Sequence, residues 1–154
     1  MELTYRVLTG PDADALKALV AKVCATMDDD MFFIPYSPDE YKMYLSGTEN
    51  AVMVGVFADG ALVAFGAMKD NGDGEYELDG AGVMSGYRNN GTQNRLICHR
   101  ANMAREMGGR YVVAYCHPAN KASLNNMIKN GFVEIGEKAL PNGTLRKKMK
   151  LDLV

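Results

Sequence analysis

Cysteine is scarce in this sequence and falls into no recognisable pattern. The three cysteines, Cys24, Cys98 and Cys116, are odd in number and far apart, and no C-x-x-C pair occurs. This spacing indicates neither a zinc site nor a disulfide framework, so we expect no bound metal. Free thiols are typical of the reducing cytosol, and we therefore expect a cytoplasmic protein.

Long apolar runs and an excess of charge of one sign are missing as well. No apolar run approaches the ~20 residues that cross a bilayer, so we expect no membrane segment. The opening residues, MELTYRVLTG, lack the basic and apolar regions of a signal peptide. The net charge of −2 gives no basic field that would favour nucleic acid. The 154 residues fit one compact domain, which we place at 1–154.

The spacing of apolar residues predicts a mixture of strands and helices. Strands are expected at 3–8, 51–58, 61–69, 75–84, 111–116, 132–138 and 144–153. Helices are expected at 11–27, 38–45, 92–107 and 120–131. The pair Asp59-Gly60 is a strong hairpin signal between the second and third strands. This order predicts an α/β (α+β) domain with helices on the faces of a mixed sheet.

The stretch GYRNNGTQNRL, at 86–96, joins a strand to a helix. Gly91 lets the backbone approach a ligand with positive φ, and N–H groups at the helix start point outward. Arg88 adds a planar cationic fork. These features describe a cradle for a diphosphate, and a plain turn with a solvated Arg88 is the alternative. The motif G-x-x-x-x-G-K-[ST] of a P-loop is not present, and 80–86 does not complete G-x-G-x-x-G.

A second motif follows the expected strand 111–116. The sequence HPANKASLNNMIKNGF starts a helix near Asn120 and stops it at Gly131. With the 86–96 loop, it resembles the GNAT superfamily of acyl-CoA-dependent N-acyltransferases, whose signature runs V-x-P-x-Y-R-x-x-G-x-G/A, then N-x-x-[AS] and K-x-G-F. The residues in register are Val83, Tyr87, Arg88, Gly91, Asn120, Ser123, Lys129, Gly131 and Phe132. The resemblance covers essentially the whole chain and implies the GNAT fold, a mixed central sheet of about seven strands with splayed central strands and about four helices on both faces.

The resemblance also implies that acetyl-CoA (coenzyme A) is bound as cosubstrate. The residues expected around its pyrophosphate are Arg88, Asn89, Asn90, Gly91, Thr92, Gln93 and Asn94. The strand residues Val83 and Met84 would pair with the pantetheine arm. Asn120 and Ser123 would lie near that arm and near the end of the cofactor that carries the leaving thiol. Two residues depart from the family pattern: Ser85 replaces a usual Pro, and Gln93 replaces a small residue, where it could crowd or cap the phosphates.

Acetyl transfer needs an unprotonated amine, a polarised carbonyl and a proton for the leaving thiolate. We expect the Met84 N–H to polarise the carbonyl, as an oxyanion hole would. Glu77 is the candidate base, at a place where several family members carry a catalytic Glu, and the alternative is a surface carboxylate beside Glu75 and Asp79. Met127 stands where the family often has a Tyr as proton donor, so water or Ser123 would have to serve.

The acceptor pocket of the family is built from the first two helices and the loop between them. Here the residues expected to form an apolar wall are Met31, Phe32, Phe33, Ile34 and Tyr36. The acids Asp28, Asp29 and Asp30 would attract a cationic amine, or would only be solvated at a helix end.

The expected function is that of an enzyme, an N-acetyltransferase acting on a primary amine of a small molecule or on an amino group of a peptide or protein. The alternative is a catalytically weak or inactive acyl-CoA-binding module acting as a sensor or partner domain, which the Met127 position favours. We expect no nucleic-acid partner and no membrane, and a homodimer is possible.

Overall fold

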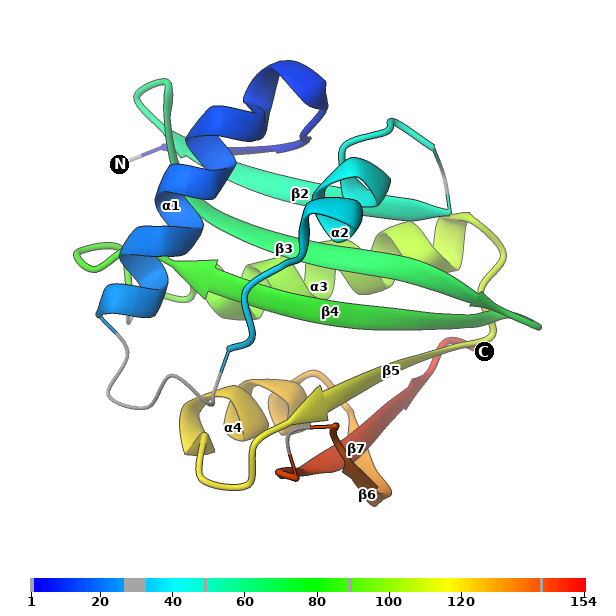
Figure 1. Ribbon diagram of the computed structural model, residues 1–154. Helices are drawn as coiled ribbons and strands as arrows, with labels where there is room; N and C mark the ends of the chain where they lie inside the picture. The colour runs from blue at the N-terminus through cyan, green and yellow to red at the C-terminus, as the bar shows by residue number, and fades with distance from the viewer. Residues whose placement is uncertain (1, 27–32, 49, 89, 142) are drawn as a thin grey trace.

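A computed structural model describes residues 2–26, 33–48, 50–88, 90–141 and 143–154 (Figure 1). The strands are β1 (Leu3–Val7), β2 (Ala51–Ala58), β3 (Ala61–Gly72), β4 (Glu75–Val83), β5 (Tyr111–Cys116), β6 (Val133–Ala139) and β7 (Leu145–Asp152). The helices are η1 (Gly10–Asp12), α1 (Ala13–Ala25), α2 (Pro38–Tyr44), α3 (Thr92–Glu106) and α4 (Lys121–Lys129). The expected order of elements is confirmed.

One sheet holds all seven strands, in the order β1-β2-β3-β4-β5-β7-β6. Neighbouring strands are antiparallel except β4 and β5, which run parallel. The predicted mixed sheet is therefore confirmed. The predicted hairpin is also present, because Asp59 and Gly60 both have positive φ, 51° and 81°, as a tight turn between twisted strands requires.

Strand β3 runs further than the sequence indicated. It was expected to end near residue 69, and residues 70–74 were expected to form a turn. Pairing with β4 instead continues to Gly72 opposite Glu75, and the turn is confined to Asp73 and Gly74, both with positive φ. The ladder extends because backbone pairing compensates the weak strand preference of Asp70 and Asn71.

Helices cover both faces of the sheet, as Figure 1 shows. Helices α1 and α2 lie on one face, where Leu16, Val20 and Tyr44 pack against Met53 and Phe65. Helices α3 and α4 lie on the other face and pack on β4, β5 and β7. Among the described residues, no helix is both long enough and apolar enough to cross a membrane.

The two central strands separate towards their carboxyl ends. Strands β4 and β5 pair only from Glu75 opposite Tyr111 to Leu78 opposite Ala114. Beyond this point β4 continues to Val83 along β3, with a register shift between Gly66 and Met68, while β5 continues to Cys116 along β7. The parallel pair therefore opens into a V, with unpaired backbone groups on its inner edges.

Helix α2, which packs on β2 and β3, begins with a capping box. The Ser37 hydroxyl accepts the Glu40 N–H at 3.1 Å, and the Glu40 carboxylate accepts the Ser37 N–H at 2.9 Å. We expect Ser37→Ala to lower the free energy of unfolding by about 1 kcal/mol, because an N–H loses its acceptor. Urea denaturation measures this, and Ser37→Thr, which keeps the cap, is the control. Equal stability of wild type and Ser37→Ala would contradict the expectation.

Candidate functional site

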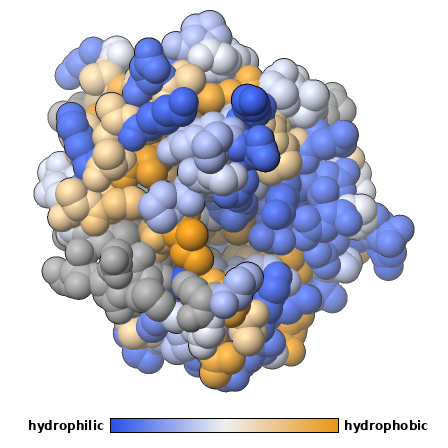
Figure 2. Space-filling model, in the orientation of Figure 1, coloured by the Kyte–Doolittle hydropathy of each residue, from blue (hydrophilic) through white to orange (hydrophobic). Residues whose placement is uncertain are grey.

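A cleft of about 790 Å³ occupies the opening between β4 and β5. It is lined by residues of β4 and β5, by the loop before α3, by α3 as far as Arg100, by α4, by the end of α1, and by Phe33 beside α2. Figure 2 views the molecule from the side of α1 and α2, and hydrophobic side chains reach the surface near the middle of this face among hydrophilic ones. The elements that form the cleft are those that the sequence motifs placed together.

The start of α3 presents free backbone N–H groups at the cleft. Gly91 is the N-cap and has φ of 84°, the left-handed conformation expected for it. The first helical bond joins the Arg95 N–H to the Gly91 carbonyl at 3.0 Å. The Asn90 side chain accepts the Thr92 N–H at 3.2 Å. The N–H groups of Gln93 and Asn94 therefore precede the helical ladder and are available to an anion.

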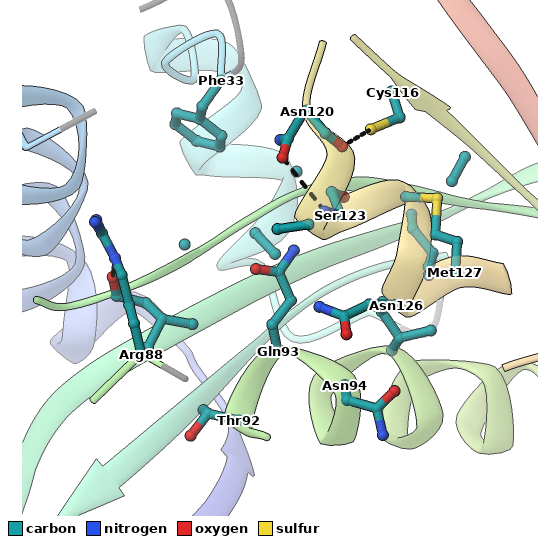
Figure 3. Close-up of a pocket in the computed structure, with 18 of the residues that line it drawn as sticks. Phe33, Arg88, Thr92, Gln93, Asn94, Cys116, Asn120, Ser123, Asn126 and Met127 are labelled. Carbon is teal, nitrogen blue, oxygen red and sulfur yellow. Dashed lines mark hydrogen bonds between the residues drawn. The ribbon is translucent and has the colours of Figure 1, made fainter. Parts of the chain in front are cut away.

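Arg88 lies beside the same opening. Its Nε donates to the Val83 carbonyl at 2.8 Å, and its Nη2 donates to the Thr26 hydroxyl at 2.8 Å. These bonds tie the loop to the end of β4 and to the end of α1. Among the described residues, no acceptor bonds to Nη1, which has two N–H donors for a ligand. In Figure 3, Arg88 stands at one side of the cleft and the Gln93 side chain extends into it towards Ser123.

The first turn of α4 forms the opposite wall. The Asn120 side chain caps the helix by accepting the Ser123 N–H at 3.3 Å, and Ser123 itself is buried. Met127 follows one turn later and also lines the cleft. Figure 3 shows Asn120, Ser123, Met127 and Cys116 gathered at this wall. Asn120 and Ser123 thus line the same cleft as the start of α3.

Cys116 ends β5 at the cleft. Its thiol approaches the carbonyl of Asn120 at 4.0 Å. Burial raises the pKa of the Cys116 thiol, while a hydrogen bond with Ser123 and the charge of Arg146 act in the opposite direction. The thiol is therefore protonated at neutral pH and is not an activated nucleophile.

The position of the Met84 N–H does not fit the role expected for it. This N–H donates to the Val63 carbonyl of β3 at 2.8 Å, so it lies within the sheet. Backbone groups alternate sides along a strand, and the pairing of Val83 with Ala64 and of Ala81 with Gly66 continues the same register. The N–H and carbonyl groups of Ala81 and Val83 therefore face the cleft. The bond from Arg88 to the Val83 carbonyl agrees with this orientation.

Glu77 lies on the paired part of β4 and does not line the cleft. Its carboxylate accepts from the Asn71 amide at 3.0 Å and is 3.9 Å from the Lys69 ammonium. It faces the side of α1 and α2, because the alternate residues Tyr76 and Leu78 pack with α3 and α4. The structure thus does not bring Glu77 together with the other predicted site residues.

The expected acceptor wall is described only in part. Phe33 is buried, lines the cleft and packs edge-on against Tyr36 with ring centroids 5.5 Å apart. Ile34 is exposed and lies outside the wall. The other predicted acceptor residues, at 28–32, and the predicted cofactor residue Asn89 lie outside the described residues.

A polar group on β4 was not recognised from the sequence. The Tyr44 hydroxyl donates to the Asp79 carboxylate, and the Tyr36 hydroxyl donates to the Asp79 carbonyl at 2.7 Å. Burial and the negative charge of Asp79 raise the pKa of Tyr44. The alternation of residues along β4 predicted a solvated carboxylate at Asp79. The two tyrosines reach Asp79 only because α2 packs on the sheet, which the sequence of β4 does not indicate.

No cluster of three His, Cys, Asp or Glu side chains suited to a metal ion occurs in the described parts of the chain. The residues that line the cleft carry side-chain amides, hydroxyls, a thiol, two guanidinium groups and the Lys129 ammonium, beside backbone N–H groups. Such a set suits an elongated anionic ligand that carries amides along its length.

The sequence matches the model of the acetyltransferase (GNAT) family over residues 21–132, which is more than half of the chain. This range includes the loop before α3 and ends at Phe132, the last residue of the second motif. No curated protein matches the sequence.

Solved structures with the same fold are numerous. An acetyltransferase of the GNAT family from Streptococcus pneumoniae is 21% identical, with a TM-score of 0.80, 98% of this chain covered and 99% of that one. The ribosomal-protein-S18-alanine N-acetyltransferase from Escherichia coli is 18% identical, with a TM-score of 0.78 and 99% and 94% covered. The protein yncA from Salmonella typhimurium, solved with its cofactor acetyl-CoA, is 17% identical, with a TM-score of 0.75 and 100% and 95% covered. At these identities, the likeness concerns the fold.

Proposed function

Because the chain belongs to the acetyltransferase (GNAT) family, we propose that it transfers an acetyl group from acetyl-CoA to a primary amine of a small molecule, peptide or protein. The observation that carries the proposal is the opening between β4 and β5, with the free N–H groups of α3 at one end and the N-terminus of α4 at the other. A cleft of this shape holds a long ligand between two strands and leaves its reactive end at the centre of the sheet.

The residues present fit coenzyme A. The N–H groups of Gln93 and Asn94, with Arg88, are donors for a diphosphate, and Gly91 has no neighbour within 4 Å of where a Cβ would lie. The cleft-facing N–H of Val83 and carbonyl of Ala81 suit the amides of the pantetheine arm. Asn120 and Ser123 would contact that arm from the other wall. The Gln93 side chain, which extends into the cleft, would cap the phosphates or move aside.

Acetyl-CoA supplies a thioester whose acyl group is activated for attack by an amine. We assign the donor that polarises its carbonyl to Ala81, because its N–H faces the cleft where β4 leaves β5 and that of Met84 does not. A fixed N–H in a site shielded from water stabilises a developing oxyanion without reorganisation.

The leaving thiolate needs a proton, and Met127 cannot donate one. We propose the Ser123 hydroxyl as the donor, since it is buried at the cleft wall beside the protonated Cys116 thiol. The thiolate would take the hydroxyl proton of Ser123, and the proton that the amine loses on forming the amide would restore the hydroxyl.

Glu77 remains the base predicted from the sequence, and its position favours the alternative of a structural carboxylate. We expect Glu77→Gln to change kcat/KM by less than about threefold, because Lys69 and Asn71 hold the carboxylate outside the cleft. A general base contributes roughly 100-fold or more. The pH dependence of kcat/KM measures this, and a loss of that size together with a lost acidic limb would assign the proton transfer to Glu77. Asp70→Asn, an exposed change on β3, is the control.

The second candidate function is an acyl-CoA-binding module without turnover, which the buried Met127 at the donor position favours. Release of free thiol from acetyl-CoA, measured over a library of primary amines and peptides, separates the two. Release with at least one amine supports the enzyme. Tight binding of coenzyme A without thiol release for any amine supports the module. An unchanged melting temperature with coenzyme A would contradict both functions, since a ligand at 100 times its Kd adds about 2.7 kcal/mol to the free energy of unfolding.

A further inference from the structure

Helix α3 buries an arginine against the sheet. Arg100 is only 2% exposed, and its neighbours along the same helix face are apolar residues such as Leu96 and Ala104. Its Nε donates to the Leu96 carbonyl at 3.2 Å, and its Nη1 donates to the carbonyls of Ala67 at 2.7 Å and Gly80 at 3.2 Å. The guanidinium therefore lies between β3 and β4, at the register shift next to the cleft.

The sheet has room for the guanidinium because β3 carries a glycine there. A Cβ on Gly66 would lie 2.9 Å from the Cζ of Arg100. Any larger residue at position 66 would displace the side chain. The chain thus combines a buried cation on α3 with a gap in the sheet that admits it.

One nitrogen of Arg100 remains for a ligand. Among the described residues, no acceptor bonds to Nη2, while Nε and Nη1 are occupied. In the described part of the chain, the Tyr5 hydroxyl is the only fully buried side-chain nitrogen or oxygen that lacks a hydrogen-bond partner. Nη2 is therefore not enclosed in the core, and Arg100 is one of the residues that line the cleft. We infer that this unpaired donor of a buried cation is available to a ligand in the part of the cleft that Gly80 and Phe33 also line.

The charge of Arg100 is not neutralised by an ion pair. No carboxylate of the described residues lies within 4.0 Å of it. Asp79 is near enough to act on its charge but accepts the Tyr44 hydroxyl on the other face of the sheet. Burial lowers the pKa of Arg100 to about 10, so the group stays cationic at neutral pH. A buried cation without a counterion favours the binding of an anion.

We propose that Arg100 forms a carboxylate subsite at the inner end of the cleft and selects a substrate that carries a carboxylate next to the reacting centre. The carboxylate would come either from the acyl group, as in a dicarboxylic acyl thioester, or from the acceptor, as in an α-amino acid. In both cases Nη2 donates a charge-assisted hydrogen bond to it. The proposal rests on the proposed acyltransferase function and narrows its substrate class.

The first arm of the experiment tests the acyl source. Calorimetry compares the wild-type affinities for succinyl-CoA and butyryl-CoA, whose acyl chains have the same length and differ in the terminal carboxylate. The second arm tests the acceptor source. Initial rates with acetyl-CoA compare each of a set of L-α-amino acids with the amine that lacks its carboxylate, and KM and kcat are separated. We expect a preference of roughly 10- to 100-fold for the carboxylate in one arm, the size of one hydrogen bond to a buried charge.

The variants Arg100→Met and Arg100→Lys assign the preference to this side chain. Arg100→Met is expected to abolish it, and Arg100→Lys, which keeps the charge without the planar fork, to reduce it in KM more than in kcat. Arg105→Met changes an exposed arginine of the same helix and is expected to alter nothing. Melting curves and coenzyme A titrations of each variant check that the fold and the diphosphate site are intact.

The outcomes separate this inference from the proposed function. Failure of wild type to bind coenzyme A would remove the proposed function and the inference with it. Normal coenzyme A binding and acetyl transfer without a carboxylate preference in either arm would overturn the inference alone. A carboxylate preference that survives in Arg100→Met would also overturn the inference. If Arg100→Met does not fold, an unreduced preference in Arg100→Lys would overturn the inference instead.

Discussion

Replacing Ala81 by proline is expected to lower kcat by about 100- to 1000-fold, because it removes the one N–H that we assign to the thioester oxygen. The change is suited to the position, since the Ala81 N–H faces the opening and gives no bond to β3. A proline is tolerated in a strand where its missing N–H is not part of a ladder. Affinity for coenzyme A should stay near the wild-type value, because the site that we propose for the diphosphate lies at the other end of the cleft.

Steady-state kinetics with the best amine found in the library would measure this effect, alongside a melting curve. Ala81→Gly keeps the N–H and separates loss of the donor from loss of the methyl group. A folded Ala81→Pro variant with a kcat within threefold of wild type would show that another donor polarises the carbonyl. The Val83 N–H, which faces the same opening, would then be the next candidate.

Replacing Arg88 by glutamine is expected to raise the Kd for coenzyme A by roughly 10- to 100-fold. The guanidinium would provide charge-assisted bonds to the diphosphate, and it also holds the loop by its bonds to Val83 and Thr26. The salt dependence of binding should weaken as well, because a cation facing the phosphates is lost. The effect on kcat at saturating acetyl-CoA should be small.

Arg95→Gln is the matched control for Arg88→Gln. Arg95 lies one turn into α3 and lines a different, shallow surface pocket with Tyr5 and His99. Titration calorimetry of both variants at two ionic strengths makes the comparison. Equal affinities of the two variants for coenzyme A would mean that Arg88 takes no part in holding the diphosphate.

Local signals explain why most of the fold was predictable. The hairpin at Asp59 and Gly60 and the start of α3 after Gly91 depend on backbone conformations that few residues adopt. The 111–116 strand was recognised because an unbroken apolar run is typical of a strand buried on both faces. These features depend on residues that are close together in the sequence, and therefore the sequence predicts them.

The direction of a single N–H was not predictable in the same way. Which of Ala81, Val83 and Met84 face the cleft depends on the register shift between β3 and β4, which spans two strands. A shift of one residue turns every backbone group to the other side of a strand. The expectation for Met84 used the sequence of one strand alone, and so it could not include this shift.

Arg100 shows a signal that was present but not used. It lies at helical spacing with Leu96 and Met103, on the stripe expected to face the core. A cation on an apolar stripe is rarely buried without a function or a partner. Gly66, which makes room for the Arg100 guanidinium, lies far from it in the sequence. Their contact could therefore be recognised only from the folded sheet.

The central claim is that the N–H groups at the start of α3, together with Arg88, hold the diphosphate of coenzyme A. Titration calorimetry with coenzyme A and with pantetheine, which lacks the nucleotide and both phosphates of the bridge, tests it most directly. We predict saturable one-site binding of coenzyme A and binding of pantetheine that is weaker by at least about 100-fold, since several charge-assisted bonds are absent. No saturable heat with coenzyme A, or equal affinity for the two compounds, would contradict the claim.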